Sequence, residues 1–204
     1  MCGRYFFQLE EGFAFYKLKK KMDQLAFFEY ATEEVFPSNQ ALVLISNQHN
    51  DYTLDVMKWG IIGYKGTLLI NARSEGIEAK KTFQPMLDKR CLIPCNGFYE
   101  WIKKGKQKQK VYIQKKGEPL IYMAAIYNQK KEFVIVTGES QNEMKNVHGR
   151  TPIMIHEDQI ASYLADDLSF EVDNEHLTFS MEKQKKKSEQ EQLALFDAHE
   201  DEQA

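Results

Sequence analysis

The sequence predicts a single α+β domain with a mainly antiparallel, barrel-like β core and a few short flanking helices. Short apolar segments alternate with polar turns along most of the chain. The connections 103–108, 115–118 and 128–131 have the composition of hairpin turns. Helical patterning is confined to short stretches between these segments. Many short strands with few helices indicate a domain built around antiparallel sheet.

The first half of the chain contains one predicted helix and three predicted strands. Residues 9–22 mix apolar and lysine positions at helical spacing, which predicts a short helix. Residues 76–89 form a helix or an irregular crossover, because Pro85 interrupts any regular helix there. Apolar runs bounded by polar turns predict strands over 41–46, 52–59 and 67–72.

The second half is predicted to contain four strands in succession, followed by helical stretches. The first of these strands is long, because apolar residues continue through 90–101. The segments 141–148 and 157–166 have helical patterning, and a short strand at 168–173 follows the second of them. The remaining strands are predicted over 109–115, 119–127 and 132–138.

Composition divides the chain into a domain over 1–181 and an acidic tail over 182–204. The 204 residues carry a net charge of −3, and the tail, with four lysines and seven acidic residues, accounts for all of it. The tail is polar and of low complexity, so we expect it to be mobile. No apolar run is long enough to span a bilayer, and charged residues interrupt the N-terminal region where a signal peptide would lie. We therefore expect a cytoplasmic protein with no membrane partner.

The three cysteines, Cys2, Cys91 and Cys95, do not form the pattern of a disulfide framework or a zinc site. Cys91 and Cys95 lie in a predicted strand without a second ligand pair at zinc spacing, so we expect free, buried thiols. No glycine-rich phosphate cradle is present. The sequence therefore predicts neither a metal nor a cofactor.

One segment is strongly basic. Residues 101–117 contain seven lysines and no acidic residue. Two interpretations stay open: a solvated hairpin, or an edge that attracts the phosphates of a nucleic acid.

Several short polar motifs stand out along the chain. Asn71 and Arg73 are two apart at the end of a predicted strand, so both side chains lie on one face. Glu100 ends an apolar strand in the stretch FYEW, and His148 lies in VHGRTPIM between a helical stretch and a strand. Each of these residues taken alone is more often a structural hydrogen-bond partner than a catalyst.

Taken together, the motifs resemble the SRAP, or SOS response-associated peptidase, family of abasic-site processing proteins. The order MCGRY, WG, NARSE, RCLIPCNGFYEW and HGRTPIM matches that family over about residues 1–180. One departure is visible: the family usually has methionine in H-x-R-M-P, where this chain has Thr151. His148, Arg150 and Pro152 of the motif remain.

The position of Cys2 suits a covalent reaction with an abasic site. Loss of Met1 leaves an α-amine and a thiol on adjacent carbons of Cys2. The amine can form a Schiff base with the open-chain aldehyde of an abasic site in single-stranded DNA, and the thiol can close a thiazolidine that links protein to DNA. The resemblance implies that Met1 is removed by thiol-dependent self-cleavage, although an aminopeptidase could also remove it. A Schiff base also makes lyase activity at the abasic site plausible.

The resemblance suggests supporting roles for other residues. Glu100 would shuttle protons, His148 would act as acid or base on the sugar hydroxyl, and Asn71 would hydrogen-bond the sugar or the amine. Trp59 and Pro37 are candidates to stack on neighbouring bases, and for Trp59 a structural place in the core stays equally open. Trp101 is expected to be a core residue. The candidates for phosphate contacts are Arg4, Arg73 and Arg150, of which Arg150 could instead brace its loop.

The tail contains a second resemblance. Gln192, Leu193, Leu195 and Phe196 match the Q-L-x-L-F peptide with which bacterial repair proteins dock on the replication sliding clamp. The alternative is that this apolar island packs back on the domain. A docking peptide in a mobile tail would be accessible, which favours the clamp as a partner.

Two other functions remain open from the sequence. In the first, Cys2, His148 and Glu100 form the nucleophile, base and orienting group of a cysteine peptidase that cleaves other proteins. In the second, the protein binds single-stranded or modified DNA without chemistry, through the lysine-rich hairpin, Arg4 and Arg73. A non-removable residue before Cys2 separates the peptidase from the crosslinking enzyme, and Cys2→Ser separates the simple binder.

Overall fold

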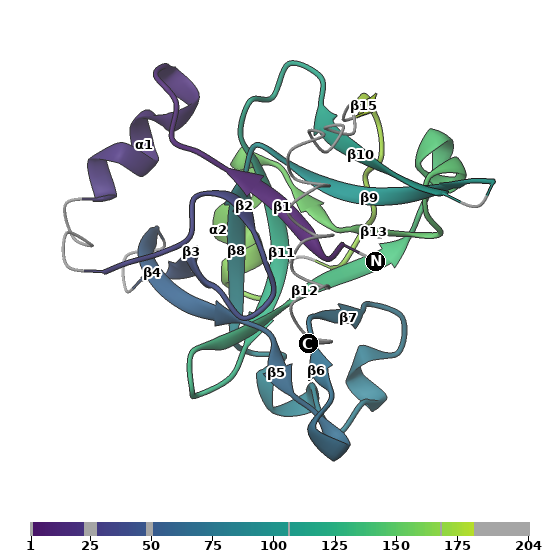
Figure 1. Ribbon diagram of the computed structural model, residues 1–204. Helices are drawn as coiled ribbons and strands as arrows, with labels where there is room; N and C mark the ends of the chain where they lie inside the picture. Colours follow the sequence, from purple (N-terminus) through teal and green to yellow (C-terminus); the bar gives the residue numbers. More distant parts are fainter. Residues whose placement is uncertain (1, 23–27, 48–50, 106, 168, 182–204) are drawn as a thin grey trace, which may run out of the picture.

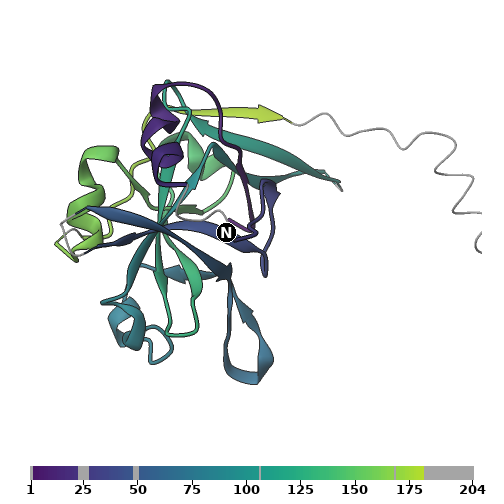
Figure 2. The same cartoon turned by 90° about the vertical axis from the view of Figure 1, so that its left-hand side faces the viewer.

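A computed structural model describes residues 2–22, 28–47, 51–105, 107–167 and 169–181. These residues form a large and a small β-sheet, a separate two-stranded sheet, and short helices (Figures 1 and 2). The large and the small sheet both contribute apolar side chains to one continuous core. The α+β prediction with a mainly antiparallel β core is therefore confirmed. No helix among these residues is long and apolar enough to cross a membrane.

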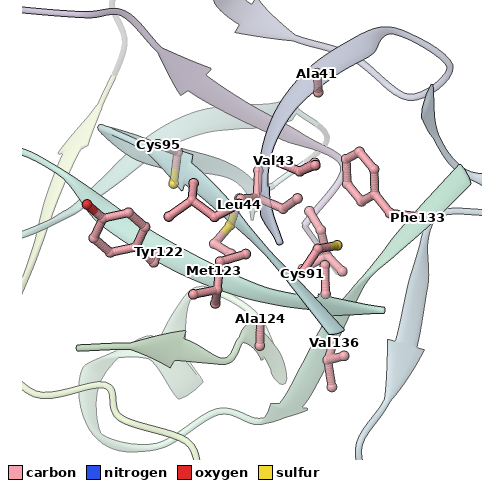
Figure 3. Close-up of a cluster of buried hydrophobic side chains, with 14 of the residues drawn as sticks. Ala41, Val43, Leu44, Cys91, Cys95, Tyr122, Met123, Ala124, Phe133 and Val136 are labelled. Carbon is pink, nitrogen blue, oxygen red and sulfur yellow. The ribbon is translucent and has the colours of Figure 1, made fainter. Parts of the chain in front are cut away.

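The large sheet closes on itself to form the barrel-like part of the core. β12 pairs with β11 as well as with β4, so the sheet returns to its starting strand through β3 and β8. Figure 3 shows apolar side chains packed in this region, among them Leu44, Met123 and Phe133, each fully buried or nearly so. In order, the strands are β13 (Arg150–Pro152), β12 (Glu132–Glu139), β4 (Tyr52–Trp59), β3 (Gln40–Ser46), β8 (Arg90–Cys95), β11 (Ile121–Tyr127) and β14 (Met154–Ile155).

The small sheet carries the start of the chain in its interior. β1 lies between β9 and β2, antiparallel to both, and Arg4 pairs with Tyr99. Tyr5 and Phe7 point into the core, while Arg4 and Phe6 lie on the opposite, partly exposed face. The residues of β9 that follow Tyr99 therefore run past the start of β1. In order, the strands are β15 (Leu177–Met181), β10 (Gln107–Lys115), β9 (Gly97–Lys104), β1 (Arg4–Phe7) and β2 (Glu33–Val35).

A corner at Asn96 divides the strand predicted over 90–101 into two. β8 belongs to the large sheet and β9 to the small one. The Asn96 side chain accepts a hydrogen bond from the Gln8 amide at 2.7 Å and donates one to the Pro119 carbonyl at 3.3 Å, which fixes the corner. Gly97 follows because a Cβ there would lie 2.5 Å from the Ile113 carbonyl oxygen of β10. The apolar pattern continues through the corner, so it did not reveal the break.

β12 is the strand that connects the two sides of the functional region. On one edge it pairs in parallel with β7 (Asn71–Arg73), with Ile135 opposite Asn71. At Thr137–Glu139 it pairs antiparallel with β13, with Glu139 opposite Arg150. Two polar motifs that are almost 80 positions apart in the sequence are thus held by neighbouring residues of one strand.

Other predicted elements were confirmed, shortened or displaced. The strands predicted at 41–46, 52–59, 109–115, 119–127 and 132–138 are present as β3, β4, β10, β11 and β12. The strand predicted at 168–173 was wrong among the residues described there; the chain forms its last strand, β15, later and against β10. The helices are α1 (Phe13–Met22) and α2 (Ile160–Leu164), with 3-10 turns at Tyr64–Gly66, Ile77–Ala79, Gln84–Met86, Asn142–Asn146 and Glu157–Gln159.

The strand predicted at 67–72 is interrupted. It forms β6 (Leu68–Leu69) and β7, with a break at Ile70. β6 pairs with β5 (Ile61–Ile62) in a small hairpin that projects at the lower side of the view in Figure 1. The tail over 182–204, and the clamp-like peptide within it, lie outside the described residues.

Candidate active site

Cys2 is fully buried immediately before β1. Its relative exposure is 0%, and its Sγ donates a hydrogen bond to the Arg4 carbonyl oxygen at 3.4 Å. Burial raises the pKa of the Cys2 thiol well above its ordinary value, and the negative charge of Glu100 raises it further. The thiol is therefore neutral near pH 7 in this state, and a nearby base must accept its proton before it reacts.

Asn71 holds the backbone of Cys2. Its Nδ2 donates to the Cys2 carbonyl oxygen at 2.9 Å, so the residue predicted to bind the sugar or the amine contacts the nucleophilic residue directly. Its Oδ1 is buried and accepts no hydrogen bond from any residue in the described ranges. A buried amide oxygen without a donor is unfavourable. The neighbouring Cys2 nitrogen, once it is a free amine, is a donor of the kind that this oxygen needs.

Glu100 and His148 complete the group. Glu100 is 3% exposed, and its Oε1 lies 3.9 Å from Nδ1 of His148. The Arg150 amide donates to the same Nδ1 at 2.9 Å, and the Arg150 carbonyl oxygen lies 3.1 Å from it. The amide hydrogen bond, the shorter of the two contacts, corresponds to the neutral ring with its proton on Nε2. The His148 side chain is 34% exposed, so its Nε2 can reach a substrate while Nδ1 stays bound to the protein.

Arg150 acts on its own loop in this structure. Its guanidinium forms a two-pronged contact with Glu75, Nη1 to Oε1 at 2.9 Å and Nη2 to Oε2 at 2.8 Å, and also donates to the Thr137 carbonyl. The hydrogen bond from Arg150 lowers the pKa of Glu75. These contacts fit the bracing role that was the alternative to phosphate binding.

The other two arginines differ in how firmly they are held. Arg4 Nη1 pairs with Glu34 Oε1 at 3.0 Å, and its guanidinium lies 3.9 Å from the centre of the Phe36 ring. Arg73 is exposed, on the same face of β7 as Asn71, while Ala72 between them is buried. Arg73 is therefore the more accessible cation beside the site.

The stacking role expected for Trp59 does not fit its position. Trp59 is 0% exposed, packs against Tyr5 and Phe133, and donates its indole N–H to the Ile70 carbonyl at 3.0 Å. It supports the chain just before Asn71 and has no face to offer to a base. Pro37 is half-buried, and Trp101, expected in the core, is also only half-buried.

Sequence reasoning missed the hairpin that precedes Asn71. Tyr64, at its tip, is 85% exposed, and Ile62 is 62% exposed. Large apolar side chains that stay in water beside a candidate site are possible contacts for a ligand. The signal was the glycine-flanked stretch after WG, because Gly60, Gly63 and Gly66 frame these residues as a turn rather than a continuous strand.

Cys2, Asn71, Glu100 and His148 thus come together from four separate segments. The group offers a buried thiol, a carboxylate, an imidazole and an amide oxygen without a donor. Within the described part of the chain, no group of three or more His, Cys, Asp or Glu side chains could hold a metal ion. Such an arrangement can move protons around a nitrogen or sulfur nucleophile at Cys2.

Comparisons with known proteins place the chain in a family. The family model for SOS response associated peptidase (SRAP) matches residues 1–194. Abasic site processing protein YoaM of Bacillus subtilis is 33% identical over 187 residues, which cover 80% of this chain and 79% of the relative. Abasic site processing protein YoqW of the same organism is 27% identical over 185 residues, covering 80% of each.

The fold has solved counterparts. A crystal structure of a protein from Bacteroides thetaiotaomicron superposes with a TM-score of 0.69 at 20% identity and covers 90% of this chain and 93% of that protein. This likeness supports the fold. With a family model that spans nearly the whole chain and a relative one-third identical, the chain belongs to the SOS response associated peptidase (SRAP) family.

Proposed function

We propose that this protein processes abasic sites in single-stranded DNA by linking Cys2 covalently to the open-chain sugar. The observation that carries the proposal is the convergence of Asn71, Glu100 and His148 on the residue that follows Met1. The names of the relatives, which are abasic site processing proteins, agree with it. The product would shield the lesion during the response to DNA damage.

The first step is hydrolysis of the bond between Met1 and Cys2. The Cys2 thiol attacks the Met1 carbonyl carbon, its proton passes to Glu100, and the proton then reaches the departing Cys2 nitrogen. Water hydrolyses the resulting thioester and restores the thiol. In this scheme the enzyme is a thiol autopeptidase, and each chain performs the reaction once.

The second step forms a Schiff base. As the sugar ring opens, the ring oxygen takes a proton from Nε2 of His148, and the C1′ hydroxyl gives its proton back to that nitrogen. The aldehyde appears at C1′ without a net change of charge. A free α-amine has a pKa of about 7.7–8.0, so a useful fraction is neutral near pH 7. The amine, held by the Asn71 Oδ1, adds to the aldehyde and one water molecule leaves.

The third step closes the thiazolidine. The Cys2 sulfur bonds to C1′, and the thiol proton passes through Glu100 to the nitrogen, so the ring closes without oxidation or reduction. Both nucleophiles belong to one residue, which gives closure a high effective molarity. If closure is slow, loss of a proton from C2′ of the Schiff base leads to elimination of the 3′ phosphate, which is lyase activity.

The β9–β10 hairpin offers a path for the DNA backbone. Lys103, Lys104 and Lys108, which we call the lysine arm, are exposed and form no ion pair with other described residues. Lys103 lies directly opposite Lys108, a like-charge pair that destabilises a hairpin. An anionic partner would remove that repulsion. The arm extends past the start of β1, so phosphates beside a lesion at Cys2 would fall within its reach (Figure 1).

Two further parts of the proposal concern location and partners. The protein would work in the cytoplasm, on the nucleoid when bound to DNA. Gln192, Leu193, Leu195 and Phe196 would dock on the sliding clamp and bring the protein to replication forks. Loss of binding to purified clamp in Leu195→Ala/Phe196→Ala is the expected result, and equal binding by the two chains would refute this part.

A single gel tests the central proposal. A labelled single-stranded oligonucleotide with one uracil is treated with uracil glycosylase, mixed with protein, and run under denaturing conditions. The wild-type chain should give a slow, heat-resistant band, and Cys2→Ala should give none. Cys91→Ala is the matched control, because it removes an equally buried thiol elsewhere and should crosslink normally.

Two additional variants assign the nucleophiles. Cys2→Ser with Met1 removed keeps the amine and should give a band only when borohydride traps the Schiff base. A chain with a non-removable residue before Cys2 should give no band under either condition. Absence of the wild-type band, with loss of Met1 confirmed by mass, would overturn the proposal in favour of a noncatalytic DNA binder.

A further inference from the structure

Asn174 joins the two ends of the loop that carries His148. Its Oδ1 accepts a hydrogen bond from the Gln141 amide at 2.8 Å, and its Nδ2 donates to Thr151 Oγ1 at 3.2 Å. Asn174 is 4% exposed and Thr151 is 0% exposed. One buried side-chain amide therefore connects the first residue of the 141–149 segment with the strand that follows it.

Thr151 is linked to the His148 imidazole through its neighbour in the chain, Arg150. Thr151 is the central residue of β13, and its neighbour Arg150 donates the amide hydrogen bond to His148 Nδ1 at 2.9 Å. That bond sets both the ring orientation and the nitrogen that carries the proton. A shift of the Thr151 backbone would move the Arg150 amide, and His148 would follow.

Asn174 is itself held in place by the segment around it. Asp173 pairs with the buried ammonium of Lys115 at 2.7 Å, and the His176 carbonyl accepts from the Lys116 amide at 2.8 Å. Val172 packs so closely on Gly138 that a Cβ there would lie 2.2 Å from its Cγ2. The segment 172–176 is thus anchored on the small sheet and on β12, and these anchors fix the position from which Asn174 binds the loop.

We propose that Asn174 is a positioning residue that orients His148 for sugar ring opening, acting through Thr151 and the Arg150 amide. The inference rests on the proposed function for its chemical consequence. Asn174 does not touch the reacting atoms in this role. It determines where Nε2 of His148 points, and a displacement of less than 1 Å at a proton donor is enough to slow a reaction substantially.

The hydroxyl of Thr151 is the atom that carries the connection from Asn174 to β13, because it accepts the hydrogen bond from Asn174 Nδ2. Valine has nearly the same shape as threonine but offers no acceptor. Replacement of Thr151 by valine therefore breaks the connection and keeps the packing.

The test compares three variants with the wild-type chain. Asn174→Ala removes the hydrogen bonds to Gln141 and Thr151, together with the one that Nδ2 donates to the Asp173 carbonyl oxygen at 3.1 Å. Thr151→Val removes one hydroxyl with nearly the same shape. Ser140→Ala is the matched control, since Ser140 is 1% exposed in the same loop and its hydroxyl has no hydrogen-bond partner among described residues. Thermal unfolding of each variant verifies that it is folded.

Three measurements are made on each chain. The crosslinking rate is measured at saturating abasic oligonucleotide. The dissociation constant is measured for an oligonucleotide with a tetrahydrofuran spacer, whose ring cannot open. The ¹⁵N chemical shifts of the His148 ring report which nitrogen carries the proton.

We expect Asn174→Ala to slow crosslinking about tenfold and Thr151→Val about threefold, with the tetrahydrofuran dissociation constant changed less than about twofold. The ¹⁵N shifts of His148 should move toward an average of the two tautomers in Asn174→Ala, and Ser140→Ala should match wild type.

Two results would overturn the inference: a folded Asn174→Ala with wild-type rate and wild-type ¹⁵N shifts, or an equal loss in Ser140→Ala. A wild-type chain that forms no crosslink would instead contradict the proposed function, and the ¹⁵N shifts would still test the positioning role.

Discussion

One buried ionisable side chain near β15, Lys115, and one at the candidate active site, Glu100, have different surroundings. Near β15, the Lys115 ammonium is 4% exposed and lies 2.7 Å from Asp173, 3.3 Å from Glu118 and 3.4 Å from a ring nitrogen of His156. We call this the lysine cluster. At the candidate active site, the shortest separation between a nitrogen of His148 and the Glu100 carboxylate is 3.9 Å, and the neighbouring Cys2 thiol is neutral.

The contacts of the lysine cluster stabilise the fold, whereas those of the candidate active site leave groups available for reaction. In the lysine cluster, opposite charges at hydrogen-bond distance compensate for the loss of water. At the site, a carboxylate is buried beside a thiol whose pKa its charge raises, and an amide oxygen of Asn71 has no donor among described residues. Changes at the site should therefore reduce activity and spare stability, and changes in the lysine cluster should do the reverse.

The largest expected effect comes from Glu100→Gln. We expect crosslinking about 100-fold slower, because a positioned general acid or base contributes on the order of 100-fold or more. The melting temperature should stay close to that of wild type, since the amide keeps the size and shape of the side chain. Rates are measured by quenched gel assays and stability by calorimetry.

The matched control is Glu118→Gln, the same substitution in the lysine cluster. It should crosslink at the wild-type rate. Equal losses of rate in the two variants would show that the distinction between the clusters is wrong.

The next effect in size is on stability. Asp173→Asn leaves the Lys115 ammonium buried with Glu118 as its remaining carboxylate partner, so we expect the free energy of unfolding to fall by about 2 kcal/mol. That corresponds to a melting temperature lower by roughly 4–8 °C. Crosslinking at 25 °C should slow by less than the roughly tenfold expected for Asn174→Ala, because the Asp173–Lys115 pair is only one of the contacts that hold the segment 172–176. Exposed Asp158→Asn should change neither quantity.

The same pair predicts a pH dependence. Burial is the largest single influence and raises the pKa of Asp173. The hydrogen bonds from Lys115 and from the Glu175 amide, together with the charges of Lys115 and His156, outweigh it, so the net pKa is lowered. A carboxyl whose pKa is lower in the folded state stabilises the fold above the unfolded pKa of about 3.9 and loses this effect as pH falls through the folded value. Wild type should therefore lose its advantage over Asp173→Asn below about pH 4 in urea titrations. A constant difference from pH 7 to pH 2 would contradict this.

The smallest effect should appear on the lysine arm, outside both clusters. Lys103→Gln/Lys108→Gln should weaken binding to single-stranded DNA and reduce the slope of log affinity against log salt by about 1.4, from about 0.7 for each phosphate contact. Neither stability nor crosslinking at saturation should fall.

Lys17→Gln/Lys20→Gln on α1, which lies on the far side of the molecule from the arm in Figure 1, is the control and should leave the slope unchanged. Equal changes of slope in the two double variants would mean that the arm has no special role.

The sequence was sufficient for the apolar strands and for the members of the site. Cys2, Asn71, Glu100 and His148 were chosen from the order of the motifs along the chain, and the structure places Glu100 in the interior of β9 rather than at the end of a strand. The strands β3 and β4 were predictable because their apolar runs are bounded by polar turns. Local pattern and tertiary structure agree there.

What could not be predicted depends on contacts between distant residues. Trp59 looked available because nothing in its neighbourhood reveals that Tyr5 and Phe133 enclose it. The corner at Asn96 is invisible because apolar residues continue on both sides. Asn174 attracts no notice in the sequence, since its two partners lie 33 and 23 positions earlier.

Because the chain is synthesised from the N-terminus, the candidate site is complete only some time after Cys2 has been made. Cys2 leaves the ribosome long before Asn71, 69 positions later, and Glu100 and His148 follow further on. At about 5–20 residues per second, roughly 7 to 30 seconds separate the synthesis of Cys2 from that of His148. During that interval Cys2 is an exposed thiol on a nascent chain, without its base and without burial. A chain interrupted before β13 would carry the reactive residue but not the means to use it, so competence for crosslinking reports that translation has passed His148.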